Sequence, residues 1–399
     1  METRPRLYST LLKDHFSKHR QMAFVSGPRQ VGKTTCCRTV GTQYLSWDTD
    51  EDRRNILLGQ RHLAEALNLS GATEKMPVIV FDELHKYAKW KSFLKGFFDT
   101  YEERVRIAVT GSSRLDVYRR GSDSLMGRYF LFRMHPWSVA EAVATDIPTN
   151  IIRQQRPIND ADWTALNEHG GFPEPFLKRD AGFTRRWRLR RNDQLSKEDL
   201  RDITKVESLG TLEVLMVLLA ENSSQQLVYS NFAAQLNVTP QTVKRWVDLL
   251  NRLHYGFSVA PWYKNVERAL RKEPKWYLRD WSGIANEGAR AETLVACHLL
   301  KAVEGWTDLG FGQFELRYIR TTTQEEVDFL IVRDRKPWVL VEVKKDKTSI
   351  SKHLFGFHAE LKTEHAFQVV MDLPYVNVDC FSYKMPIIVP ARTFLSQLL

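Results

Sequence analysis

The stretch AFVSGPRQVGKTTCCRTV, residues 23–40, decides the fold of the first part of this chain. Gly27 and Gly32 bracket four residues and are followed by Lys33 and Thr34, which gives the pattern G-x-x-x-x-G-K-T. The apolar run MAFVSG leads into this loop, and TTCCRTV after it has a helix-like pattern. A strand, a glycine-containing loop and a helix in this order are typical of phosphate-binding loops. The segment therefore predicts an α/β fold that binds a nucleotide.

Each position of the loop has a mechanical role in binding phosphate. The glycines allow a tight turn whose N–H groups face the phosphate oxygens. Lys33 can reach the β- and γ-phosphates, the Thr34 hydroxyl can bind Mg²⁺, and the helix that opens at Thr35 directs its positive end at the same anion. We therefore expect ATP and Mg²⁺ as cofactors. The predicted nucleotide-binding residues are Gly27, Pro28, Arg29, Gln30, Val31, Gly32, Lys33, Thr34 and Thr35.

Residues 1–150 contain five short apolar runs, separated by helical or polar stretches: MAFVSG, QYLSWD, PVIVFDEL, RVRIAVTGSS and RYFLFRMHP. Apolar strands that alternate with helices predict a parallel sheet buried on both faces. Ligands bind such sheets at the carboxyl ends of the strands, where the polar residues of these runs lie. Residues 1–150 are thus predicted to form a P-loop ATPase domain.

The run VIVFDE is the second part of the nucleotide signal. Asp82 ends the run and is placed to hold the water shell of Mg²⁺, and Glu83 can orient or deprotonate the attacking water. Ser112, in VTGSS, is a candidate sensor of the γ-phosphate. Phosphoryl transfer also needs a cation, often an arginine of a neighbouring subunit, so we expect a homo-oligomer with Arg128 as the candidate. Three other arginines compete for this role: Arg114, Arg119 and Arg120.

Several segments together resemble the prokaryotic AAA-type ATPases that have a DUF4143 C-terminal region. They are SGPRQVGKTT, YLSWD, VIVFDELHKYAKWKSFLKGFFD, VTGSSRLDVYRRGSDSLMGRYF and HPWSVAEA. The resemblance implies an AAA+ core. In that core Lys33 and Thr34 belong to the Walker A motif, Asp82 and Glu83 to the Walker B motif, and Ser112 to the sensor segment.

Residues 151–285 are predicted to form a helical middle domain. The segment KRDAGFTRRWRLRRND, residues 178–193, interleaves basic and aromatic side chains. Two interpretations of Phe183 and Trp187 stay open. The rings can stack on nucleic-acid bases beside phosphate-binding arginines, or they can pack in the core as an i,i+4 pair with the arginines in solvent.

The segment YSNFAAQLNVTPQTVKRWVDLLNRLHYGFSV, residues 229–259, predicts a winged helix-turn-helix. Thr239 is a candidate N-cap, and Pro240 stands at the first helical position. The second helix places Val243, Trp246, Val247, Leu250 and Leu253 on one face. Lys244 and Arg245 lie elsewhere on that helix and can reach a DNA groove, although such modules also bind proteins.

Residues 286–399 predict a small α/β domain in which carboxylates converge. The runs QEEVDFLIV and PWVLVEVKK are strand-like, and a period of two places Glu342 and Lys344 on one face. Asp328 on the first run and Glu342 on the second can hold Mg²⁺, with Glu292 of the helix RAETLVACHLLKAV completing the set.

This constellation resembles the PD-(D/E)XK nuclease fold, with Val327 before Asp328 where proline is usual. The resemblance implies catalytic or metal-binding roles for Glu292, Asp328, Glu342 and Lys344. An alternative interpretation is a β-hairpin with surface charges, because E-x-K is a loose pattern.

The whole chain has 399 residues and a net charge of +10, which indicates an anionic partner, with nucleic acid as the leading candidate. Its N-terminal segment has no signal-peptide core, and its four cysteines form no disulfide framework, so we expect a cytoplasmic protein away from membranes. Two functions compete. One is an ATPase that acts on DNA, with a nuclease-like domain that binds or cleaves it. The other is an ATP switch that assembles with a protein partner.

Overall fold

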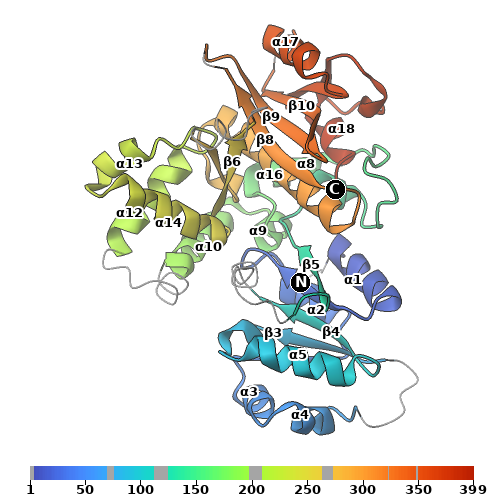
Figure 1. The fold of residues 1–399 in the computed structure, drawn as a ribbon. Helices are drawn as coiled ribbons and strands as arrows, with labels where there is room; N and C mark the ends of the chain where they lie inside the picture. The colour runs from blue at the N-terminus through green and yellow to red at the C-terminus, as the bar shows by residue number, and fades with distance from the viewer. Residues whose placement is uncertain are drawn as a thin grey trace. The chain divides into compact units, whose positions relative to one another are not determined.

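A computed structural model describes residues 4–69, 76–111, 125–196, 209–262, 273–321, 323–346 and 349–399 (Figure 1). The chain divides into two compact units. The first contains Met1–His135 and Thr145–Ile147, and the second contains Pro136–Ala144 and Pro148–Leu399. The boundary near residue 135 lies before the predicted end of the ATPase domain at residue 150.

The first unit is built on a parallel sheet of five strands in the order β2-β3-β4-β1-β5. Each of the five predicted apolar runs forms one strand. The strands are β1 (Met22–Ser26), β2 (Gln43–Ser46), β3 (Val78–Asp82), β4 (Arg106–Thr110) and β5 (Tyr129–Arg133). The predicted parallel sheet is therefore confirmed.

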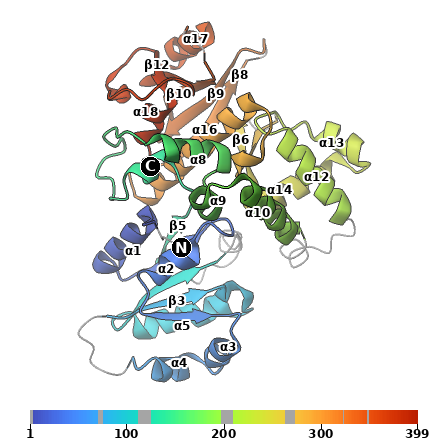
Figure 2. The ribbon, with the colours of Figure 1, turned by 180° about the vertical axis from the view of Figure 1, so that it is seen from behind.

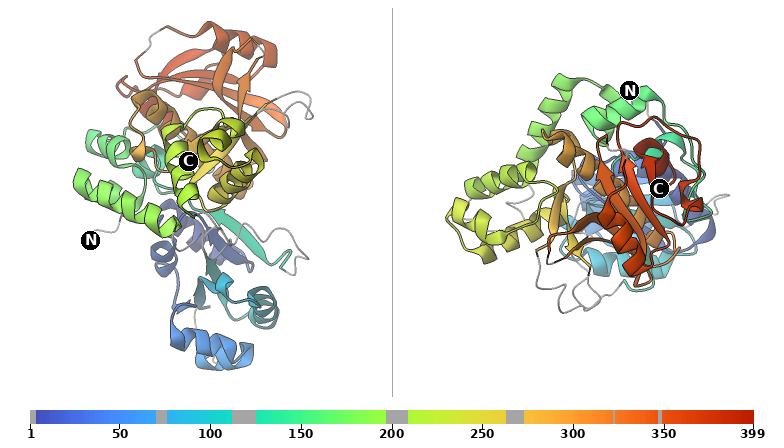
Figure 3. Two further views of the ribbon diagram at one scale, coloured as in Figure 1. Left: turned by 90° about the vertical axis from the view of Figure 1, so that its left-hand side faces the viewer. Right: turned by 90° about the horizontal axis from the view of Figure 1, so that it is seen from above.

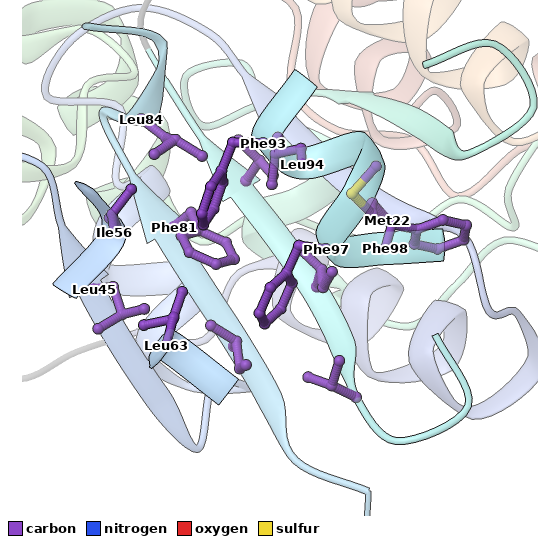
Figure 4. Packing of buried hydrophobic residues seen from close by; sticks show 14 of the residues in the cluster. Met22, Leu45, Ile56, Leu63, Phe81, Leu84, Phe93, Leu94, Phe97 and Phe98 are labelled. Atoms are coloured by element: carbon purple, nitrogen blue, oxygen red, sulfur yellow. The ribbon is translucent and has the colours of Figure 1, made fainter. Parts of the chain in front are cut away.

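Helices of the first unit bury the apolar faces of this sheet. The helices are α1 (Leu7–Lys18), α2 (Lys33–Arg38), α3 (Asp50–Leu57), α4 (Gln60–Ala66), η1 (Leu84–Lys86) and α5 (Trp90–Tyr101). Figure 4 shows the apolar side chains of α5 beside those of the sheet. The ring of Phe81 on β3 lies 6.1 Å from that of Phe93 and 5.9 Å from that of Phe97. Phe93 and Phe97 are one helical turn apart, which is why both meet the same strand.

The second unit contains a mixed sheet of seven strands in the order β12-β11-β10-β9-β8-β6-β7, which Figure 3 shows from two directions. The strands are β6 (Gly256–Pro261), β7 (Lys275–Leu278), β8 (Phe314–Arg320), β9 (Glu326–Arg333), β10 (Lys336–Lys344), β11 (His365–Val370) and β12 (Ile387–Pro390). The predicted strand runs around Asp328 and Glu342 are β9 and β10, which pair antiparallel. Because β6 and β7 join this sheet, it extends across residue 285, and the division into a middle and a C-terminal domain stays a prediction.

The helices of the second unit lie in two groups along the chain. The first group is α7 (Val139–Val143), α8 (Asp160–His169), α9 (Pro173–Lys178), α10 (Ala181–Gln194), α12 (Leu209–Glu221), α13 (Tyr229–Leu236) and α14 (Pro240–Arg252). The second is η3 (Trp281–Gly283), α16 (Glu287–Asp308), α17 (Lys352–Leu361), η4 (Cys380–Ser382) and α18 (Ala391–Ser396). Helices α12, α13 and α14 stand together beside β6 in Figures 1 and 2.

Helix α14 has the two faces that its sequence predicts. The Thr239 side chain caps it by accepting a hydrogen bond from the N–H of Thr242, and Pro240 is its first residue. Its apolar face is buried, whereas Lys244 and Arg245 are exposed. The short helix α13 precedes it, and the antiparallel pair β6–β7 follows it in sequence.

The ring of Trp187 on α10 is part of the protein core. Trp187 is only 6% exposed, and its ring lies 5.1 Å from that of Phe172. The guanidinium of Arg191 covers the Phe172 ring at 4.2 Å. Base stacking by Trp187 is therefore the wrong interpretation, because a ring enclosed by protein side chains cannot receive a base.

Among the described residues, no helix combines the length and apolarity needed to cross a bilayer.

Candidate functional site

Three neighbouring strands of the first sheet bring the predicted nucleotide residues to one edge. The phosphate-binding loop follows β1, Asp82 ends β3, and Thr110 ends β4. These strands are adjacent and parallel in the order β3-β4-β1. Their carboxyl ends therefore meet, as expected for a ligand site on a parallel sheet.

The loop has a backbone that requires glycine at both ends. Gly27 has φ +152°, and a Cβ atom at this position would lie 2.2 Å from the carbonyl oxygen of Met134. Gly32 has φ +98°, which side chains with a Cβ rarely adopt. The chain therefore passes tightly against the segment after β5 before it enters α2.

Lys33 is the first residue of α2, and its ammonium group turns back into the loop. It donates to the carbonyl oxygens of Gly27 at 2.9 Å and Pro28 at 2.8 Å. Burial lowers the pKa of Lys33 to about 8, against the opposing influence of Glu83 and Asp82. A buried ammonium whose charge is poorly compensated favours a bound anion. The loop therefore fits a nucleotide phosphate.

The carboxylate of Asp82 lies among three hydroxyl groups. Thr34 donates to its Oδ2 at 3.3 Å, Tyr44 donates to the same oxygen, and Thr110 donates to Oδ1. Burial, followed by the hydrogen bond to Asp82, raises the pKa of Tyr44, so this phenol stays protonated and donating. The contact between Thr34 and Asp82 places the two predicted Mg²⁺ ligands side by side, and these oxygen atoms suit Mg²⁺.

Glu83 has a left-handed backbone, with φ 56° and ψ 20°. Such a conformation costs about 1–3 kcal/mol in a residue with a Cβ and is concentrated at functional sites. Its N–H donates to the carbonyl oxygen of Thr110 at 3.1 Å. Its Oε2 lies 3.7 Å from both His85 Nε2 and Lys86 Nζ. Burial raises the pKa of Glu83, which brings this carboxyl closer to the proton affinity useful for a general base.

The remaining predicted residues are Ser112 and the candidate arginines. Ser112 lies outside the described residues, as do Arg114, Arg119 and Arg120. Arg128 immediately precedes β5, at the amino edge of the sheet, about 15 Å along the strands from the phosphate loop. There it pairs with Asp99 of α5 at 2.6 and 2.9 Å. Its side chain therefore does not belong to the phosphate site of its own subunit.

Arg6 supports the phosphate loop, a role that no motif around it indicates. It is 7% exposed and donates to the carbonyl oxygens of Val31 at 2.8 Å and His135 at 2.7 Å. The fork of one guanidinium thus ties the loop to the segment after β5. Val31 and His135 lie 25 and 129 positions from Arg6 in the sequence, so no local pattern predicts these contacts.

We expect Arg6→Met to weaken ATP binding by at least about tenfold, because hydrogen bonds from a charged donor contribute about 1.5–3 kcal/mol each. Fluorescence titration with a nucleotide analogue measures the affinity. Lys18→Met is the matched control, since it removes an exposed positive charge from the adjacent helix α1. Equal affinities of Arg6→Met and wild type would show that the loop keeps its shape without Arg6.

In the second unit, the four predicted nuclease-like residues come together from three elements. Glu292 lies on α16, Asp328 on β9, and Glu342 and Lys344 on β10. Lys344 Nζ pairs with Glu342 Oε1 at 2.8 Å, so the two share a face as predicted. The N–H of Val343 donates to Asp328 Oδ2 at 2.8 Å, which links the two strands at this point.

Two residues of β7 complete this cluster. Lys275 Nζ lies 3.0 Å from Glu292 Oε1, 2.5 Å from Glu326 Oε1 and 3.6 Å from Asp328 Oδ1. The Tyr277 hydroxyl donates to the same oxygen of Glu292 at 2.8 Å. Lys275 and Tyr277 alternate along the KWYL run of β7, so both side chains lie on one face of the strand. This alternation is the pattern in the sequence that links the two residues.

The predicted metal role of Glu292, Asp328 and Glu342 stays a prediction. Across the described part of the chain, no group of three or more His, Cys, Asp or Glu side chains is placed to hold a metal ion. The ammonium of Lys275 lies among the carboxylates of Glu292, Glu326 and Asp328. Burial, followed by the charge of Asp328, raises the pKa of Glu292 to about 7. Burial also raises the pKa of Asp328.

Comparison with known proteins divides the chain into three matched segments. Residues 19–143 match a family model described as an AAA domain. Residues 160–294 and 287–378 match two domains of unknown function, DUF8612 and DUF4143.

Two uncharacterized proteins, from Mycobacterium bovis and Mycobacterium tuberculosis, are each 24% identical to this chain over 341 residues. The match covers 84% of this chain and 72% of each relative.

Among solved structures, the Aeropyrum pernix ORC1 protein in complex with DNA matches 73% of this chain and 90% of its own, at 13% identity and a TM-score of 0.32. Cdc6p from Pyrobaculum aerophilum matches 73% and 92%, at 12% identity and a TM-score of 0.26. TM-scores of this size do not establish a shared fold. The matched segments nevertheless agree with the phosphate loop and sheet described above: the AAA-domain match contains the loop and the sheet, and the DUF4143 match follows in the second unit.

Proposed function

We propose that this protein is an AAA+ type ATPase that hydrolyses ATP and acts on DNA. The observation that supports hydrolysis most directly is the convergence of Lys33, Thr34, Asp82 and Glu83 at one edge of the sheet. Lys33 and Thr34 lie on α2, Asp82 ends β3 and Glu83 follows it, and the buried ammonium of Lys33 favours an anion.

The residues at this edge of the sheet have different roles in hydrolysis. Lys33 and the loop N–H groups would hold the phosphates, while Thr34 and Asp82 would hold Mg²⁺. Bound Mg²⁺ neutralises the charge that develops on the phosphates. Glu83 orients the attacking water and accepts its proton. Arg128 completes such a site only from a neighbouring copy, because in its own subunit it lies at the opposite edge of the sheet.

The second unit supplies the proposed DNA contacts. Helices α13 and α14 with the β6–β7 pair have the element order of a winged helix-turn-helix, and α14 exposes Lys244 and Arg245. The net charge of +10 favours a polyanionic partner. We include the nuclease-like region as a DNA-binding surface. Cleavage is not part of the proposal, because the ammonium of Lys275 lies beside the carboxylates of Glu292 and Asp328 that a catalytic metal would need.

Stimulation of ATP hydrolysis by DNA is the experiment that tests the proposal. Phosphate release is measured with and without duplex and single-stranded DNA. An increase with DNA supports it. ATP hydrolysis that no DNA changes, together with no binding of DNA at low salt, would favour the ATP switch that assembles with a protein partner.

We expect DNA binding to weaken steeply as salt rises, because contacts with phosphates release counterions. Charge reversal of Lys244 and Arg245 to Glu should lower the affinity and reduce the slope of log K against log salt by about 2. Fluorescence anisotropy at several salt concentrations measures both quantities.

The matched control reverses two exposed lysines of the first unit, Lys13 and Lys18. An equal loss of affinity in the control and in the α14 variant would mean that only net charge matters. That outcome would remove α14 as the DNA-contacting helix.

A further inference from the structure

Lys275 is the central cation of the carboxylate cluster in the second unit. Its side chain is 5% exposed, and its ammonium lies within 3.6 Å of carboxylate oxygens from Glu292, Glu326 and Asp328. These acids come from α16 and β9, whereas Lys275 comes from β7. A lysine so enclosed by carboxylates is a structural counter-ion rather than a solvated surface charge.

Hydrogen bonds and ion pairs within the chain engage one oxygen of each predicted metal ligand. Oε1 of Glu292 accepts from both Lys275 and Tyr277. Asp328 Oδ2 accepts the N–H of Val343, and Glu342 Oε1 pairs with Lys344. Oε2 of Glu342 is buried and has no hydrogen-bond partner among the described residues. The ammonium groups of Lys275 and Lys344 therefore compete with a metal ion for the carboxylates of Glu292, Asp328 and Glu342.

The ammonium and a divalent ion exclude each other at this place. Mg²⁺ requires near-octahedral oxygen ligands at about 2.0–2.1 Å. The ammonium of Lys275 lies 3.0 Å from Glu292 Oε1 and 3.6 Å from Asp328 Oδ1. It therefore lies between two carboxylates that Mg²⁺ would need as ligands. Two cations this close repel each other strongly, and the carboxylates cannot contact both at their preferred distances.

The local charges are nearly balanced without an added ion. Among the described residues of this cluster, four carboxylates face three cations. The carboxylates are Glu292, Glu326, Asp328 and Glu342, and the cations are Lys275, Arg320 and Lys344.

We propose that Lys275 replaces the divalent cation of a nuclease-like site, so that this region keeps its fold without metal and does not cut DNA. The proposal assigns to Lys275 a structural role inside a site whose carboxylates would otherwise bind metal. It does not depend on ATP hydrolysis by the first unit.

The test is the binding of Mn²⁺ to the full-length chain, stripped of metal and free of nucleotide, followed by electron paramagnetic resonance. We expect wild type and Asp328→Asn to bind the same amount of Mn²⁺, because Asp328 is not a ligand while Lys275 is present. Lys275→Met should gain about one tight Mn²⁺ site, and Asp328→Asn in that background should remove it. Lys345→Met is the matched control, because Lys345 pairs with Glu287 outside the cluster and is 53% exposed. It should not gain a site.

The wild-type measurement decides the question even if Lys275→Met fails to fold. A tight Mn²⁺ site in wild type that Asp328→Asn abolishes, with or without duplex DNA, would overturn the proposal. Mn²⁺-dependent cleavage of DNA by wild type that Asp328→Asn abolishes would overturn it as well. Failure of the proposed ATPase function shows instead as an absence of phosphate release by wild type, so the two failures are distinguishable.

Discussion

Glu83→Gln is expected to bind ATP but to hydrolyse it about 100- to 10,000-fold more slowly than wild type, which is the usual contribution of a general base. The amide keeps the shape and the hydrogen-bonding reach of the side chain but cannot accept a proton from water. Lys33→Ala should differ, because it removes the ammonium that faces the phosphates, so binding itself should weaken. Phosphate release and nucleotide affinity, measured side by side, separate the two effects.

The pH dependence gives a second check of Glu83. Burial raises the pKa of its carboxyl, so the base becomes protonated at a higher pH than an ordinary glutamate. Wild-type hydrolysis should therefore decline as the pH falls through this raised pKa, and the residual rate of Glu83→Gln should lack that decline.

Glu65→Gln is the matched control, since Glu65 is an exposed carboxylate on α4 that pairs with Arg61. Its hydrolysis rate should equal that of wild type. Hydrolysis at the wild-type rate by Glu83→Gln would show that another group activates the water.

The nucleotide edge could be predicted from sequence because its elements are local. Loop, strand and helix follow one another within residues 22–38, and Asp82 directly ends an apolar strand. The burial pattern of α14 was also predictable, since a period near 3.6 residues fixes which side chains share a face. In these cases spacing along the chain determines proximity in the fold.

The missed contacts depend on residues that are distant in sequence. Arg6 reaches a carbonyl 129 positions away, and the pairing of strands β6 and β7 with the C-terminal strands brings Lys275 to Asp328. The pattern E…D…E-x-K contains Glu292, Asp328 and Glu342 but not Lys275, because Lys275 lies on another strand. Trp187 shows the same limit, because its enclosure depends on Phe172 and Arg191.

Lys301→Met is expected to lower the stability of the second unit by about 3–5 kcal/mol, the usual cost of an unpaired buried charge. Lys301 on α16 and Glu141 on α7 form an ion pair, and each residue is 1% exposed. Lys301 also donates to the carbonyl oxygen of Pro136 at 3.3 Å. Removal of the ammonium takes away the positive charge that Lys301 places beside the buried Glu141 carboxylate. Denaturant titration followed by tryptophan fluorescence measures the loss.

The double variant Lys301→Met with Glu141→Leu replaces both charges. It separates the loss of stability from removing one partner from the net contribution of the ion pair to stability. Because well-packed apolar residues can replace a buried pair at little cost, the double variant should recover most of the stability that Lys301→Met loses. Lys384→Met is the surface control, since Lys384 and Glu364 are 65% and 51% exposed and such pairs contribute about 0–1 kcal/mol. If Lys301→Met unfolds within about 1 kcal/mol of wild type, or if the double variant is less stable than the single one, then Glu141 does not depend on Lys301 for its charge compensation.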